Sequence, residues 1–102
     1  MFTEQWNSES QWPGYAENLL GRAVREAMSA PELRESERAR LRTLTSNLVR
    51  RLRRSGMEPQ TAILQVKEIL HQSSRGIRVE QRHIEIWGDV IRWTISAYYR
   101  AD

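Results

Sequence analysis

The sequence predicts an all-α fold, a compact arrangement of four helices. Four stretches carry apolar residues at intervals of three and four, no stretch alternates apolar and polar residues as a half-buried strand does, and proline, glycine or serine separates the stretches. With 102 residues, 39% hydrophobic and 28% charged, the chain has the size and composition of one folded domain. We expect an N-terminal aromatic arm over residues 1–14 and a single helical domain over residues 15–102.

The first two helices are predicted on either side of a proline. An apolar face and alanines suited to close packing predict a helix over residues 15–28. Ser29-Ala30-Pro31-Glu32 then has the pattern of a capping box, with proline in the first turn. We therefore expect the second helix to begin directly after Ser29 and to end near Arg54, before Ser55-Gly56. Its apolar stripe consists of Leu41, Leu44, Leu48 and Leu52.

The third and fourth helices are predicted over residues 58–72 and 79–100. Pro59 lies in the first turn of the third helix, and Ser73-Ser74-Arg75-Gly76 has the composition of a loop. Short connections favour antiparallel neighbours, so we expect a compact bundle.

The last helix carries more apolar surface than one core-facing stripe needs. One stripe has the spacing of a core face and consists of Ile84, Trp87, Ile91, Ile95 and Tyr98. A second stripe lies beside it and consists of Ile86, Val90, Trp93 and Ala97. Two interpretations remain open. Either the second stripe is buried beneath the aromatic arm, or it forms, with Trp6 of the arm, an interface to a second copy or a partner protein.

Basic charge is concentrated in the second helix. The chain has 16 basic residues, all arginine except Lys67, and a net charge of +3. The candidate residues for an anionic partner are Arg38, Arg42, Arg50, Arg51, Arg53 and Arg54. That partner is nucleic acid, an acidic protein or an anionic membrane surface. The alternative is that the arginines form an ordinary solvent-exposed face without a partner. Glutamates in the first turns and arginines in the last turns of one helix complement the helix dipole, which explains their distribution.

The second and third helices also have the lengths of a helix-turn-helix, with a short turn containing Gly56. The third helix would then read DNA with Gln60, Thr61, Gln65, Lys67, Glu68 and His71. This set has nearly balanced charge, whereas a helix that contacts DNA bases usually has positive charge nearby. The pattern is therefore a weak indication of sequence-specific DNA binding.

No motif in the sequence indicates catalysis or a metal site. The chain has no cysteine and two histidines, and the Glu80-to-His83 spacing of a di-iron bundle occurs once where such a bundle needs it on two helices. We therefore expect no enzymatic activity, no cofactor, no metal ion and no small-molecule substrate. The chain also has no leader-like segment at its start and no apolar run of ~18 residues, so we expect a cytoplasmic protein.

Two segments carry a resemblance to other proteins. Gly56-Met57-Glu58-Pro59 leads into residues 62–70, and the chain nears its end with Trp93-Thr94-Ile95-Ser96-Ala97-Tyr98-Tyr99-Arg100. These segments resemble short, uncharacterised helical proteins of GC-rich bacteria, in which a Pro-Glu helix precedes a terminal Trp-x-Ile-x-Ala-Tyr-Tyr-Arg helix. Here Pro59-Gln60 replaces Pro-Glu, and the matching segments cover under a quarter of the chain. The resemblance implies a bacterial origin and no particular activity.

The function expected from the sequence is that of a small protein-interaction or regulatory module. It binds a protein partner or a second copy of itself through the second stripe of the last helix and the aromatic arm. The alternative is a nucleic-acid-binding protein that uses the arginine-rich end of the second helix, and docking on a membrane surface is the least favoured of the three.

Overall fold

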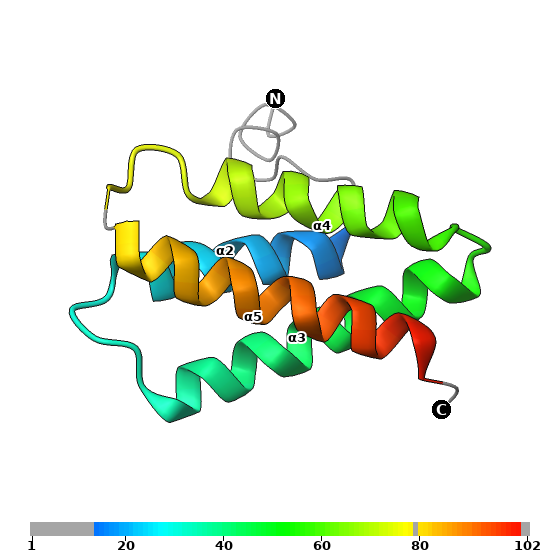
Figure 1. The fold of residues 1–102 in the computed structure, drawn as a ribbon, viewed down its shortest axis with the longest axis horizontal. Helices are drawn as coiled ribbons and strands as arrows, with labels where there is room; N and C mark the ends of the chain where they lie inside the picture. Colours follow the sequence, from blue (N-terminus) through cyan, green and yellow to red (C-terminus); the bar gives the residue numbers. More distant parts are fainter. Residues whose placement is uncertain (1–13, 79, 101–102) are drawn as a thin grey trace, which may run out of the picture.

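The computed structural model describes residues 14–78 and 80–100, and this part of the chain folds into helices joined by short segments (Figure 1). The helices are α2 (Tyr15–Ser29), α3 (Glu35–Arg54), α4 (Pro59–Ser73) and α5 (Glu80–Tyr99). The described residues contain no strand, which confirms the predicted all-α class. Apart from Gly14, the expected N-terminal arm lies outside the described residues.

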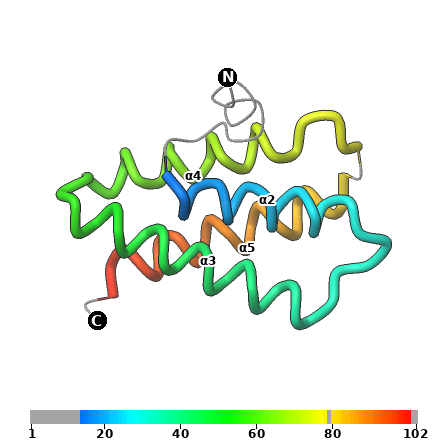
Figure 2. Tube along the Cα trace, turned by 180° about the vertical axis from the view of Figure 1, so that it is seen from behind, coloured from blue at the N-terminus to red at the C-terminus, as the bar shows by residue number. Residues whose placement is uncertain are grey.

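The helices form a four-cornered bundle in which α2 and α5 occupy opposite corners. In Figure 1 α4 lies above and α3 below, with α5 crossing in front of α2, and Figure 2 shows the same arrangement from behind. Each of α2 and α5 packs against both α3 and α4, and the diagonal pairs have far fewer contacts. The expectation of antiparallel neighbours therefore holds for α2 with α3 and for α4 with α5. Although a short turn joins α3 to α4, these two helices lie on a diagonal.

The start of α3 differs from the sequence expectation. Helix α2 continues through Ser29, and Ala30 is extended, with φ −71° and ψ 150°. The reason is Pro31, because a residue that precedes proline is disfavoured in the helical conformation. Helix α3 begins only at Glu35, where the backbone N–H of Arg34 donates to Glu37 Oε1 at 3.1 Å. The glutamate that caps this helix is thus Glu37 and not the one in the expected capping box.

The other boundaries agree with the sequence. Helix α3 ends at Arg54, and Gly56 follows with φ 92°, the left-handed conformation that glycine adopts without strain. Pro59 is the first residue of α4, where its missing N–H costs no helical hydrogen bond.

The core lies at the centre of the bundle and receives side chains from every described helix. Its most deeply buried aliphatic residues include Leu20 and Val24 of α2, Leu48 and Val49 of α3, Val66 and Ile69 of α4, and Ile86 and Val90 of α5. Of the leucine stripe expected on α3, Leu41, Leu48 and Leu52 are buried and Leu44 is half-buried. The apolar faces of α2, α3 and α4 are therefore used as the sequence predicts.

Two arginines bind the C-terminal ends of neighbouring helices. Arg82 of α5 donates to the backbone oxygens of Ala27 at 2.7 Å and Ala30 at 2.9 Å, at the end of α2. Arg25 of α2 donates to the backbone oxygen of Ser73 at 3.2 Å, at the end of α4. The last carbonyls of a helix have no partner within it, so these guanidinium groups satisfy them. Both arginines therefore serve the fold.

Candidate functional site

The second stripe of α5, one of the two surfaces expected to bind a partner, is partly core. Ile86 exposes 1% of its surface and Val90 exposes 0%, and both belong to the central apolar cluster. Neither side chain is open to a partner in the folded chain, which corrects their assignment to an interface. Trp6, the fifth residue of that assignment, lies outside the described residues.

The first stripe of α5, expected to face the core, is partly exposed. Ile84 exposes 70% and Ile95 43% of their surface, whereas Ile91 is half-buried. The inward face is completed instead by Thr94, which is fully buried and donates its hydroxyl to the backbone oxygen of Val90 at 2.8 Å. A threonine can occupy this position because its hydroxyl bonds within its own helix. The sequence pattern did not reveal it, since threonine was not counted as part of an apolar stripe.

Trp93 and Ala97 lie at the edge between core and surface. Both are half-buried and pack against the apolar cluster. Both also line a pocket of about 160 Å³ between α3 and α5, which we call the α3/α5 pocket. Two of the residues expected at a protein interface are therefore partly accessible, at the seam between two helices.

The arginines early in α3 are engaged within the chain. Arg38 forms an ion pair with Asp89 of α5, and Arg40 pairs with Glu26 of α2 at 3.2 Å. Arg38 was expected to contact an anionic partner, but its charge is already matched by the carboxylate of Asp89. Only 13% of the Asp89 side chain is exposed. It joins α3 to α5 and is not a free cation.

Arg53, at the other end of α3, is engaged as well. Its guanidinium donates to the backbone oxygen of Arg100 at 3.0 Å and lies 6.0 Å from the centre of the Tyr98 ring. Both contacts are made to the end of α5, so Arg53 acts on that helix terminus much as Arg82 acts on the end of α2. Arg53 was expected to contact an anionic partner, but its guanidinium group is already bound within the chain.

Among the described residues, four arginines of α3 neither pair with a carboxylate nor bind a helix end, and we call them the basic face of α3: Arg42, Arg50, Arg51 and Arg54. Arg50 makes a hydrogen bond of 3.5 Å to Asn47 Oδ1. Within residues 14–78 and 80–100, the other three have neither a hydrogen-bond nor an ion-pair partner for their side chains. All four side chains are exposed. Their cationic groups are thus free to meet an anion from outside the chain.

A groove lies on one side of the basic face, between α2 and α3. This α2/α3 groove has a volume of about 350 Å³. Its lining combines apolar groups with the guanidinium groups: Tyr15, Ala16 and Leu19 from α2, and Leu44, Asn47, Arg50, Arg51 and Arg54 from α3. Tyr15 exposes 75% of its surface, and the two leucines are half-buried. The groove therefore offers apolar contact area next to positive charge.

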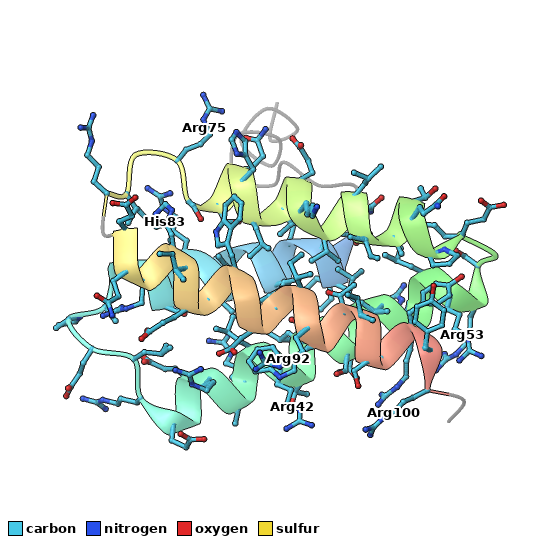
Figure 3. All side chains as sticks on the ribbon, viewed as in Figure 1. Arg42, Arg53, Arg75, His83, Arg92 and Arg100 are labelled. Carbon is cyan, nitrogen blue, oxygen red and sulfur yellow. The ribbon has the colours of Figure 1, made fainter. Side chains whose placement is uncertain are left out.

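The α3/α5 pocket lies on the other side of the basic face and is more polar. Its lining consists of Arg42, Ser46 and Arg50 from α3 and Trp93, Ser96, Ala97 and Arg100 at and near the end of α5. Figure 3 shows Arg42 and Arg100 on the same side of the molecule, below α5 in that view. Arg50 lines both hollows, so the groove and the pocket adjoin along α3.

Sequence reasoning predicted Trp93 and Ala97 of α5 as interface residues, but it missed the residues that α2 contributes to the groove and Arg100 at the end of α5. Tyr15, Leu19 and Arg100 lie far from α3 along the chain, and only the packing of α2 and α5 on both sides of α3 brings them together. Tyr15 is an exposed aromatic residue at the first position of α2, four residues before Leu19 on the same side of the helix. That feature was the one available signal.

The histidines pack around an indole. His83 is stacked on Trp87 with ring centres 6.2 Å apart, and His71 approaches the same ring edge-on at 6.5 Å. His83 Nε2 also lies 3.0 Å from the backbone oxygen of Ile77. No group of three or more potential metal ligands occurs within the described part of the chain. Among these same residues, no helix has the length and apolarity that crossing a membrane requires.

The placement of α3 and α4 differs from that in a helix-turn-helix. In that motif the two helices pack against each other, whereas here they occupy a diagonal of the bundle. Of the residues expected to read DNA, Gln65 is half-buried and donates to Glu17 Oε2 at 3.2 Å. The other five are exposed on α4.

The fold and the surfaces described so far define a four-helix bundle domain with a basic, partly apolar face. Comparison with protein-family models, with curated proteins and with solved structures gave no match to this chain.

Proposed function

We propose that this chain is a protein-interaction module, and that it binds an acidic, amphipathic segment of a partner protein in the α2/α3 groove. The observation that carries the proposal is the pairing of free charge with apolar surface. Arg51 and Arg54 have no side-chain partner within the described residues, and they line the same groove as Leu19 and Leu44.

The chemistry of this groove fits a peptide better than a phosphate backbone. A partner helix with leucine-like residues on one side and carboxylates beside them would bury the former against Leu19, Leu44 and Tyr15 and pair the latter with the arginines. Nucleic acid phosphates would use the arginines alone and leave the leucines without a contact. The apolar lining is therefore the feature that favours protein over nucleic acid.

The second candidate is a nucleic-acid-binding protein, and the α3/α5 pocket favours it. Arg42, Arg50 and Arg100 line that pocket together with the half-buried Trp93. Guanidinium groups beside an aromatic face are the combination that binds the backbone and stacks the bases of single strands. This candidate makes the α3/α5 pocket the site, so substitutions on the two sides of Arg50 distinguish the two functions.

The proposal is tested with a synthetic helical peptide that has leucines along one face and glutamates on both flanks. A scrambled peptide of the same composition and a single-stranded oligonucleotide are measured in parallel by fluorescence anisotropy. We expect the amphipathic peptide to bind, and the double substitution Arg51→Glu with Arg54→Glu to weaken it at least about tenfold.

The matched control is Arg75→Glu. Arg75 is exposed and lies two residues after the end of α4, across the molecule from Arg53 in Figure 3. It should leave peptide affinity within about twofold. Equal binding of the scrambled peptide, or binding of the oligonucleotide alone with a steep dependence on salt, would overturn the proposal. Loss of oligonucleotide binding on Arg42→Glu would then support the second candidate.

A further inference from the structure

The outward face of α5 is an apolar stripe that the described part of the chain leaves largely exposed. Ile84, Gly88, Ile91 and Ile95 follow one another at intervals of four, three and four, so they lie along one line of the helix. Ile84, Gly88 and Ile95 are exposed and Ile91 is half-buried. In Figure 1 α5 crosses the front of the bundle, so no other described helix covers this side.

Gly88 is not explained by any contact within the described part of the chain. It lies inside a helix, where glycine is less favourable than alanine because it loses more backbone freedom. A Cβ atom built on Gly88 would meet no atom within 4 Å, so no neighbour within the described chain excludes a side chain there. A glycine at such a position lets a second backbone or a large side chain approach the helix closely.

The spacing of the stripe is symmetric about its own centre. Ile84 and Ile95 lie equally far from the midpoint between residues 89 and 90, and so do Gly88 and Ile91. When two α5 helices pack antiparallel about that midpoint, each Ile84 meets Ile95 of the second copy. Each Ile91 then meets the open surface at Gly88 of the second copy. The face is therefore complementary to itself, which is the requirement for a two-fold interface.

Charges beside the stripe agree with the same packing. Glu85 and Arg92 are seven residues apart, so both lie on one flank of the stripe, and both are exposed. In an antiparallel pair related by a two-fold axis, the same flank of each helix faces the other helix. Glu85 of each copy therefore lies near Arg92 of the other. Arg92 bonds within the chain to Asp89 at 2.6 Å, while Glu85 has no side-chain partner among the described residues. In a pair of copies, each Glu85 would gain Arg92 of the other copy as its partner.

We propose that the outward face of α5 is an interface between two copies of this chain, with the two α5 helices packed antiparallel about the midpoint between residues 89 and 90. This face differs from the one that the sequence suggested, because Ile86 and Val90 point into the core. It also lies apart from the α2/α3 groove, so the interface can exist whether or not the groove binds a peptide.

The first test measures the mass of the full chain by sedimentation over a concentration series up to about 1 mM, because a single helix pair is a small interface. We expect a dimer at the upper end, and a monomer throughout for Ile84→Glu. The matched control is Leu64→Glu on α4, since Leu64 exposes 64% of its surface and Ile84 exposes 70%. A wild-type monomer at every concentration, or equal loss of association in both variants, overturns the proposal.

The second test exchanges charges. Glu85→Arg alone places two pairs of like charges across the interface, and Arg92→Glu alone does the same, so each variant should dimerise at least about tenfold more weakly than the wild type. Mixing the two variants restores both opposite-charge pairs in a heterodimer. We expect the mixture to associate more tightly than either variant by itself. A mixture no tighter than its components contradicts the antiparallel register.

The third test separates the interface from the fold. Gly88→Ala should raise the thermal midpoint of the monomeric domain, because alanine favours the helix and meets no atom of the chain. The same substitution should raise the dimer dissociation constant about tenfold, since the added methyl group lies where Ile91 of the second copy packs. Unchanged dimerisation with a raised midpoint would show that nothing approaches Gly88, and would overturn the packing.

Discussion

Helix α5 carries isoleucines on two faces, and only one of these faces packs into the core of its own chain. Ile86 exposes 1% of its surface, whereas Ile84, two residues earlier, exposes 70%. Two residues are separated by about 200° around a helix, so the same type of side chain points to opposite sides. The difference shows that apolarity gives α5 two candidate core faces, and that the positions of α3 and α4 select one of them.

The largest expected difference between the faces is in packing. Ile86→Ala removes a fully buried side chain from the core cluster and should lower the free energy of unfolding by about 2–5 kcal/mol. Ile84→Ala removes an exposed side chain and should change it by about 0.5 kcal/mol or less. The measurement is urea unfolding at the lowest protein concentration that gives a signal, so that association does not contribute. Equal losses would mean that the helix is rotated from the orientation described.

The next difference concerns the two kinds of arginine on α5. Arg82→Met leaves the backbone oxygens of Ala27 and Ala30 without their donor and should cost about 2 kcal/mol. Arg92→Met breaks an ion pair in which 67% of the Arg92 side chain is exposed, and should cost below about 1 kcal/mol. Thermal unfolding followed by circular dichroism ranks the two variants. A reversed ranking would refute the capping role of Arg82.

A smaller effect is expected at the neighbouring tyrosines. The hydroxyl of Tyr98 donates to the backbone oxygen of Met57 at 2.6 Å, so Tyr98→Phe should cost about 1 kcal/mol. Tyr99 exposes 65% of its surface, and Tyr99→Phe should have an effect near zero. Chemical denaturation of the two variants side by side gives the difference directly, and no difference would imply that the Tyr98 hydroxyl is bound to water instead.

The smallest effect is expected at Thr94, the polar member of the inward face. Its hydroxyl bonds to the backbone oxygen of Val90, which also accepts the helical hydrogen bond. Thr94→Val keeps the branched shape and removes a group whose bond is local, so the unfolding free energy should change by about 0.5 kcal/mol or less. Destabilisation as large as that of Ile86→Ala would show that the hydroxyl has a role beyond its own helix.

The arginines, like the isoleucines of α5, fall into two groups, one engaged in the fold and one exposed. Arg25, Arg53 and Arg82 bind helix ends, and Arg38 and Arg40 pair with carboxylates. Arg42, Arg50, Arg51 and Arg54 remain as the basic face of α3. The sequence shows that the charge is concentrated, but a guanidinium has the same sequence signal whether it satisfies a carbonyl of the fold or points to solvent. Contacts between residues distant in sequence assign each role.

By itself the sequence determined the features that depend on residues close together in the chain. The all-α class, the ends of α2, α3 and α4, and the apolar faces of these three helices follow from periodicity, glycine and proline, and these are properties of neighbouring residues. The predicted start of α3 was wrong because Ser29 and Glu32 have the pattern of a capping box, whereas Pro31 keeps Ala30 extended and the helix begins only at Glu35. The tertiary structure alone decided which face of α5 is buried and which arginines remain free. Both depend on how α2 and α5 pack against α3, and that packing is set by the whole core at once.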